Sequence, residues 1–279
     1  MADNVEQLKA LRQATGARML DCQKALKECN GNMDEAMAWL RKKNLAAGEA
    51  TSTRQAQEGL LGVKVGADGR TMAIVEVSSN TDFVARNEKF KALVNQLAEL
   101  CEGLKIDSVE VLQRQRLNGR GVSETLQELA GTMGENIAIK RVAFIEGELG
   151  HYVHFDQKQA CVVELEGVTG EKARELGKEL AMHIVFAKPT CISPEEVPAE
   201  EVQKEKAIIQ ERLKEDPKNS KKPPQILEKI AEGQLGKFYS TVCLNEQPYF
   251  RENAKKVSQV LKENGGAKVK RFIYMKVGG

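Results

Sequence analysis

Residues 76–85 read Glu-Val-Ser-Ser-Asn-Thr-Asp-Phe-Val-Ala, and they join an alternating strand pattern at residues 71–77 to a long helical pattern. The three residues Asn80–Asp82 can each cap a helix, because a short side-chain oxygen accepts hydrogen bonds from the free N–H groups of a first helical turn. Phe83 then falls in that first turn. Large aromatic side chains are usually buried, so one interpretation packs Phe83 onto the sheet. The other interpretation presents Phe83 to a partner as an exposed wedge.

The composition is that of an ordinary globular protein, with 279 residues, 41% hydrophobic residues and 29% charged residues. A net charge of +2 is too small for a protein whose main partner is nucleic acid. The sequence contains no run of about 18 apolar residues, the length needed to span a membrane, and its first residues show no leader pattern. The six cysteines never form a C-x-x-C pair, which favours reduced thiols over disulfides or zinc. We therefore expect a cytoplasmic protein without direct contacts to nucleic acid or membrane.

The first 45 residues predict a module of three short helices. Gly16 ends the first helix and Asn30-Gly31 ends the second, as glycine commonly does at a helix C-terminus. A core this small is typical of a docking module. Residues 46–58 are small and polar and lack an apolar stripe, so they predict a linker that lets the module move.

The remaining chain predicts two copies of one unit, in the order strand, strand, helix, insert, helix, strand. Residues 139–145 of the first copy are echoed by residues 269–275 of the second, and residues 122–126 by residues 257–261. The fold class is therefore α+β, with a duplicated core of antiparallel sheets that carry helices on one face.

The insert of the second copy is much longer than that of the first. It is densely charged, with a thin apolar stripe on each side of a hairpin tip at residues 216–224, and it predicts an antiparallel helical arm. Elsewhere the pattern places strands at residues 152–155 and 268–277, and helices at residues 107–116 and 254–264. The predicted domains are the module at 1–45, the linker at 46–58, the first core copy at 59–147, the second core copy at 148–188 and 245–279, and the arm at 189–244.

Motifs for enzymatic chemistry are not found in the sequence. Phosphate-binding, dinucleotide-binding, nucleophile-elbow and zinc-protease patterns do not occur. His151 and His154 lie three apart on a predicted strand, and therefore on opposite faces. His183 has apolar helical neighbours, and we expect a hydrogen-bonded core histidine. The sequence thus predicts a binding protein that is not an enzyme and uses neither cofactor nor metal.

Several ordered motifs together resemble those of the elongation factor Ts family, the bacterial guanine-nucleotide exchange factors for elongation factor Tu. The motifs span the chain and are Thr15-Gly16-Ala17, Asp21-Cys22, Asn80-Thr81-Asp82-Phe83-Val84-Ala85, Gly134-Glu135-Asn136-Ile137, Ala181-Met182-His183 and Gln247-Pro248-Tyr249. The resemblance implies a ubiquitin-associated-like three-helix module, the duplicated core and a coiled-coil arm. It also implies binding to GDP-bound and nucleotide-free elongation factor Tu, and an arm similar to the family's homodimerisation element.

The resemblance further implies roles for individual residues. The segment similar to the one that dislodges the partner's Mg²⁺ and promotes GDP release consists of Thr81, Asp82, Phe83 and Val84. The residues that match partner-binding positions are Leu11, Arg12, Met19 and Leu20 in the module, Met133 and Gly134 in the core, and His154.

Three departures from the family pattern accompany these matches. Arg18 stands where the family often has glycine, and Val185-Phe186 replace small residues. The sequence stops at Gly279, so the resemblance does not imply a contact through the extra C-terminal helix of some members. A non-catalytic ribosome-associated or assembly scaffold, built from the same module and arm, is the alternative function.

Overall fold

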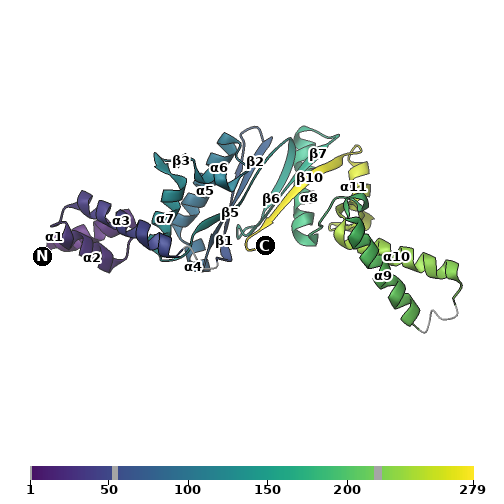
Figure 1. Cartoon of the computed structure of the whole chain (residues 1–279). Coiled ribbons are helices and arrows are strands. Elements are labelled where there is room, and N and C mark those ends of the chain that lie inside the picture. Colours follow the sequence, from purple (N-terminus) through teal and green to yellow (C-terminus); the bar gives the residue numbers. More distant parts are fainter. Residues whose placement is uncertain (1, 52–55, 217–221) are drawn as a thin grey trace. The chain divides into compact units, whose positions relative to one another are not determined.

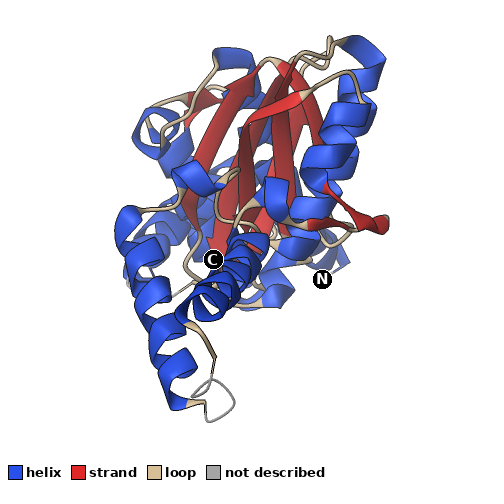
Figure 2. Ribbon diagram, turned by 90° about the vertical axis from the view of Figure 1, so that its right-hand side faces the viewer, coloured by secondary structure: helices blue, strands red, loops and turns tan. Residues whose placement is uncertain are grey.

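The computed structural model describes residues 2–51, 56–216 and 222–279, whose helices and strands are drawn in Figures 1 and 2. The chain divides into two compact units. The first unit comprises Met1–Glu146, Val153–Ala160 and Met275–Gly279, and the second comprises Gly147–Tyr152 and Cys161–Tyr274. Each unit is described by itself.

The helices are α1 (Ala2–Thr15), α2 (Met19–Glu28), α3 (Met33–Thr51), α4 (Asp82–Ala85), α5 (Glu88–Leu104), α6 (Val109–Gln113), α7 (Val122–Met133), α8 (Gly170–Ala187), η1 (Pro194–Glu196), α9 (Ala199–Glu215), α10 (Pro224–Val242), η3 (Leu244–Glu246) and α11 (Val257–Glu263). The strands are β1 (Glu58–Val65), β2 (Thr71–Ser79), β3 (Arg116–Leu117), β4 (Arg120–Gly121), β5 (Ala138–Glu146), β6 (Glu148–Val153), β7 (Gln159–Glu166), β8 (Pro248–Tyr249), β9 (Glu252–Lys256) and β10 (Lys268–Lys276).

Helices α1 to α3 enclose a small apolar core of their own. Its buried residues are Leu11, Ala17, Cys22, Ala25, Leu26, Ala36 and Leu40. The three predicted helices are therefore present, but the third continues to Thr51. The predicted linker is wrong for residues 46–51, which are helical, and its residues 52–55 lie outside the described residues.

Helix α3 extends past the module core because it packs along α7. The two backbones approach closely: a Cβ at Gly48 would lie 2.2 Å from the Gln127 carbonyl oxygen, and one at Gly131 only 1.8 Å from the Asn44 carbonyl oxygen. Small residues allow such helix packing without an apolar stripe. The small, polar composition that predicted a linker is thus the composition of a close helix–helix contact.

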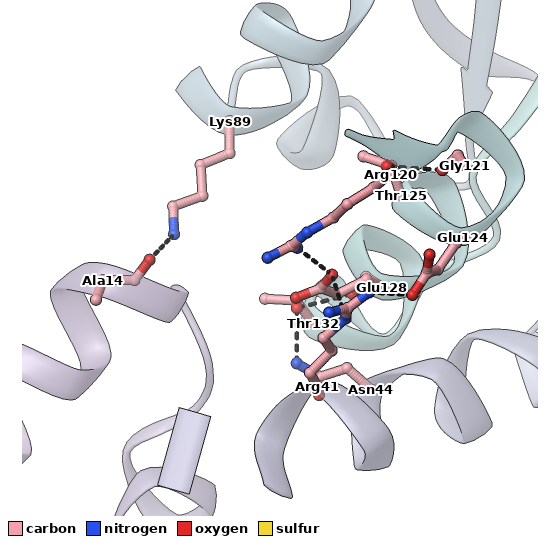
Figure 3. Close-up of polar contacts among 10 residues, drawn as sticks. All are labelled: Ala14, Arg41, Asn44, Lys89, Arg120, Gly121, Glu124, Thr125, Glu128 and Thr132. Atoms are coloured by element: carbon pink, nitrogen blue, oxygen red, sulfur yellow. Dashed lines mark hydrogen bonds and ion pairs between the residues drawn. The ribbon is translucent and has the colours of Figure 1, made fainter. Parts of the chain in front are cut away.

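Polar contacts reinforce the packing of α3 on α7 (Figure 3). Arg41 on α3 pairs with Glu124 and, at 3.7 Å from its Nε, with Glu128 on α7. Asn44 Nδ2 donates to Thr132 Oγ1 at 2.9 Å. The helical module and the start of the core are consequently joined by an extended contact within the first unit.

The first sheet has the strand order β1–β2–β5 and is antiparallel. Eight of the nine residues of the central strand β2 are buried, so both of its faces are covered. Helix α5 packs on β1 and β2 through an apolar face with Phe90, Val94 and Leu97.

The second sheet has the order β10–β7–β6, with β7 in the centre. Helix α8 shares a core with β7, in which Leu176, Leu180 and Ile184 accompany Val163 and Leu165. The strand order β1–β2–β5 of the first copy therefore corresponds to β6–β7–β10 of the second, and the repeat predicted from the sequence is also seen in the structure.

Two glycines three residues apart recur at the start of each copy, Gly59 and Gly62 within β1, and Gly147 directly before β6 with Gly150 inside it. Gly59 and Gly147 have φ angles of +147° and +151°, a conformation that favours glycine. Gly62 and Gly150 face the backbone of α5 and α8, where a Cβ would come within 2.4 and 2.3 Å of backbone atoms. Each copy thus brings its sheet against its long helix by the same means.

A buried carboxylate also recurs on the central strand of each sheet. Glu76 is 2% exposed and accepts from Arg141 Nε at 2.5 Å. Glu164 is 5% exposed and accepts from Arg271 Nε at 2.6 Å and from Lys270 Nζ at 2.9 Å. The arginines belong to the echoed segments, so the repeat includes a charged pair as well as apolar residues.

Helices α9 and α10 lie side by side and run in opposite directions (Figure 1). Ile209 and Leu213 are the buried residues of α9. The predicted hairpin tip includes residues 217–221, which lie outside the described residues.

Three predicted elements differ from those in the structure. The strand predicted at 152–155 begins earlier, as β6, and ends at Val153. The helix predicted at 254–264 starts at Val257, because the preceding residues pair as the ribbon β8–β9 despite their helical propensity. The helix predicted at 107–116 is the shorter α6, since the chain then enters the ribbon β3–β4.

Among the described residues, no helix combines the length and apolar character needed to cross a membrane.

Candidate functional site

The corner after β2 contains one separate helical turn before the long helix. Thr81 is extended (φ −126°, ψ 158°), α4 covers Asp82–Ala85, and Arg86 ends it. Asn87 then caps α5, because its side chain accepts from Lys89 N at 2.9 Å. The long helix therefore does not start at the corner but one turn later.

The short helix α4 orients its side chains in opposite directions. Val84 and Ala85 are buried in the core of the first copy, whereas Phe83 is 77% exposed. Successive helical residues are rotated by about 100°, so the residue that precedes two inward positions turns outward. The interpretation of Phe83 as a core residue is wrong, and the aromatic ring is presented to the surface.

Glu135 holds the corner in place. Its carboxylate accepts from Thr81 N at 3.0 Å and from Thr81 Oγ1 at 2.6 Å. Beside it, Asn136 N donates to Asn80 Oδ1 at 2.7 Å. Thr81 occupies the N-cap position of α4, but its side chain does not cap the helix as the sequence suggested. Instead it bonds to Glu135, and we call this pair of Thr81–Glu135 hydrogen bonds the Glu135 brace.

The same residue also connects the corner to helix α3. Thr51, buried at the end of α3, donates from Oγ1 to the Glu135 carbonyl oxygen at 3.1 Å. Glu135 therefore contacts α3 through its backbone carbonyl and the corner through its side-chain carboxylate. Sequence reasoning did not assign a site role to Glu135, and the available signal was its place in the motif Gly134–Ile137.

The module residues predicted to bind a partner divide into two groups. Arg12, Met19 and Leu20 are exposed, with Leu20 at 78%. Leu11 is 0% exposed and lies in the module core. The prediction of Leu11 as a surface contact is therefore wrong for its side chain, which supports the helices that carry its exposed neighbours.

Arg18 and Gly134 bring the module and core predictions together. Gly134 ends α7 in the left-handed conformation (φ 75°), and a Cβ there would lie 2.6 Å from Arg18 Nη2. Both residues line a pocket of about 450 Å³ with Leu20 and Thr51. Met133 is half-buried and packs against the core. The structure thus places Leu20 and Gly134 on one pocket.

His154 lies in the turn between β6 and β7. Its backbone N–H donates to the Gln159 carbonyl oxygen at 2.8 Å, and its ring lies 4.5 Å from that of Phe155. Phe155 is 89% exposed. This turn is a second exposed aromatic feature of the first unit, which sequence reasoning did not identify.

His183 on α8 has a structural role. His183 is buried, its Nε2 donates to Gln247 Oε1 at 2.9 Å and its Nδ1 accepts from Phe250 N at 3.3 Å. Burial lowers the pKa of His183, and the Gln247 hydrogen bond partly opposes this shift. His183 is thus the hydrogen-bonded core histidine that the sequence predicted. Within the described residues, no three His, Cys, Asp or Glu side chains gather as a metal site.

Comparison with known proteins identifies the family. A family model described as "Elongation factor TS" matches residues 80–279, a stretch that begins with the corner itself. The elongation factor Ts of Deinococcus deserti is 38% identical over 275 residues, which cover 98% of this chain and 99% of the relative. That of Alkalilimnicola ehrlichii is 38% identical over 283 residues, covering 100% of this chain and 93% of the relative. That of Deinococcus radiodurans is 38% identical over 275 residues, with coverage of 98% and 99%.

The chain belongs to the elongation factor Ts family. As a member, it is a nucleotide-exchange factor for elongation factor Tu in translation elongation, and the scaffold alternative is not favoured. Elongation factor Ts relatives cover the helical module as well, which precedes the part that the family model matches. The similarity to the family therefore extends over nearly the whole chain, from the helical module to the last strand.

Proposed function

We propose that the segment Thr81–Val84 is the part of this exchange factor that displaces Mg²⁺ from GDP-bound elongation factor Tu. The observation that carries the proposal is the orientation of α4, with Phe83 77% exposed and Val84 anchored in the core. An exposed Phe normally costs free energy in water, and the Glu135 brace holds this one outward at Thr81. The segment is thus a preorganised wedge.

The wedge acts by linkage. A bound nucleoside diphosphate is held largely through Mg²⁺ and backbone amides around its phosphates. If the exchange factor favours the partner state that has lost the ion, it weakens nucleotide binding by the same factor by which nucleotide weakens its own binding. Asp82, which pairs with Arg86 at 2.7 Å, adds a negative charge next to the wedge.

Several contacts are needed for a large effect. A thousandfold weakening of GDP binding requires about 4 kcal/mol of coupling, more than one Phe side chain supplies. We therefore propose that Arg12, Met19 and Leu20 anchor the module on the partner's GTPase domain. In the same proposal Met133, Gly134 and His154 form further contacts, and Leu11 supports the module from within.

The finer architecture follows the same proposal. Helices α1 to α3 form a ubiquitin-associated-like module, and α9 with α10 forms a coiled-coil arm through which two copies associate. The protein acts in the cytoplasm without active-site chemistry of its own, and without binding nucleic acid or membrane directly.

The experiment is release of a fluorescent GDP analogue from elongation factor Tu, followed by stopped flow with and without this protein. The proposal expects accelerated release, and excess free Mg²⁺ should reduce the acceleration because it opposes loss of the ion. Acceleration that is insensitive to Mg²⁺ would contradict displacement of the ion, and no acceleration would contradict exchange altogether.

A further inference from the structure

Two cysteines far apart in the sequence meet at the base of the helical arm. Cys191 lies between α8 and the arm, and Cys243 directly follows α10. Their Sγ atoms are 3.5 Å apart. Among the described residues, this is the one hydrogen-bond contact between two thiols, and both are free.

The backbone holds the two cysteines in register. Cys191 and Cys243 form an isolated parallel β-bridge. The Leu244 N–H donates to the Cys191 carbonyl oxygen at 2.9 Å, and the Cys191 N–H donates to the Val242 carbonyl oxygen at 3.2 Å. The approach of the thiols therefore follows from a paired backbone and is not an accident of two flexible side chains.

We propose that Cys191 and Cys243 form a redox modification site, at which a peroxide converts the two thiols into an intramolecular disulfide. The bond would close the chain from residue 191 to residue 243 and link the two ends of the arm covalently. The site lies in the second unit, and its chemistry is independent of the exchange activity proposed for the corner.

The exposure of the two thiols assigns their order of reaction. Cys191 is half-buried and can meet a small oxidant, whereas Cys243 is fully buried. Burial, together with the hydrogen bond and charge of Cys191, raises the pKa of Cys243 to about 12, so its thiol remains neutral at neutral pH. Since the thiolate is the nucleophile, Cys191 reacts first and Cys243 second.

The reaction balances in two steps. The Cys191 thiolate attacks one oxygen of hydrogen peroxide, which leaves a sulfenic acid on Cys191 and releases hydroxide that takes up a proton as water. The Cys243 thiol then passes its proton to the sulfenic hydroxyl, and the thiolate so formed attacks the Cys191 sulfur. The S–O bond breaks and the hydroxyl leaves with that proton as a second water. Two thiols lose two electrons in total, and one peroxide is reduced to two waters.

The test is oxidation of the folded full-length chain with hydrogen peroxide, followed by quenching, unfolding and a count of free thiols. We expect a loss of two of the six thiols, a peptide map that joins the Cys191 and Cys243 peptides within one chain, and recovery of both thiols with dithiothreitol. In guanidinium, where the backbone bridge is absent, we expect a mixture of disulfides among several cysteines without preference for the Cys191–Cys243 pair.

Matched variants make the result specific. Cys29→Ser removes a half-buried cysteine of the first unit and should still lose two thiols. Cys243→Ser should leave Cys191 as a sulfenic acid that dimedone traps. Six surviving thiols, a disulfide between other cysteines in the folded chain, overoxidised Cys191 beside an intact Cys243, or the same mixture of disulfides from folded and unfolded chains would each overturn the proposal.

Discussion

The two core copies connect their central strand to their long helix in different ways. Thr81 and Thr169 each follow the buried glutamate of their copy by five residues, and both are extended. In the second copy α8 starts at once after Thr169, and Glu148 accepts from Gly170 N at 3.0 Å. In the first copy α4 with its exposed Phe83 intervenes. The shared parts are those that the fold needs, so the extra turn of the first copy is the part left free for function.

The largest expected effect comes from Phe83→Ala. Because the ring is 77% exposed, we expect stability to change by less than about 0.5 kcal/mol. GDP release should slow by about 30- to 100-fold, equivalent to about 2–3 kcal/mol, while much of the binding to elongation factor Tu remains. Stopped-flow release and titration calorimetry measure the two quantities.

The second copy offers the matched control for Phe83. Phe186 on α8 is 78% exposed, so Phe186→Ala removes the same area from the surface. We expect it to leave GDP release unchanged. Equal losses in the two variants would mean that the difference between the copies does not reside in the extra turn, and loss of folding in Phe83→Ala would make Phe83 structural.

The next effect concerns what the copies share. Glu76→Gln and Glu164→Gln each remove a buried carboxylate from its arginine, and because charge-assisted hydrogen bonds are lost we expect each to cost about 2 kcal/mol. Urea unfolding measures the cost. Similar losses of unfolding free energy in the two variants would confirm that the buried carboxylates share a structural role. A loss in only one variant would mean that the two copies share their backbone fold but not this charged pair.

The pH dependence of stability shows how much of the contribution of Glu164 comes from its charge and how much from its packing. Burial raises the pKa of Glu164, but the hydrogen bonds and charges of Lys270 and Arg271 lower it by more, and the net pKa lies below the ordinary value of 4.5. The stabilisation is therefore present above about pH 4.5 and is lost as the pH falls through the folded-state pKa. We expect Glu164→Gln to flatten this acid limb, and an unchanged limb would contradict the assignment.

Much of this fold follows from local patterns, whereas the site depends on contacts between distant residues. The alternating strands, the apolar face of α5 and the echoed segments predicted the duplicated α+β core. Residues 46–51 could not be predicted as helix, because their small side chains signal packing only once α7 is known. The role of Glu135 was hidden for the same reason, since it lies 54 residues from the Thr81 that it holds. The exposure of Phe83 could not be predicted either, because it depends on Val84 and Ala85 taking the core positions of α4.

A smaller effect is expected when the brace itself is removed. Glu135→Ala removes both hydrogen bonds that Thr81 donates to Glu135, so the corner should lose its fixed orientation. We expect GDP release to slow by about tenfold, or about 1.4 kcal/mol, with little change in affinity for elongation factor Tu. Glu148→Ala removes a carboxylate that accepts from the backbone at the corner of the second copy, and it should leave GDP release unchanged. A fall in affinity equal to the fall in release would show that Glu135 supports binding and not orientation.

The smallest effect separates the two equivalent threonines. Thr81→Val keeps the shape but removes the 2.6 Å hydrogen bond to Glu135, and we expect a loss of about 0.5–1 kcal/mol in stability. Thr169 is exposed and its side chain does not cap α8, so Thr169→Val should stay within about 0.5 kcal/mol of the parent. Combining Thr81→Val with Glu135→Ala should add little to Glu135→Ala alone, because both remove the same contact. Additive losses would mean that Thr81 stabilises the corner through a neighbour other than Glu135, and the hydrogen bond between the two side chains would then not be what orients α4.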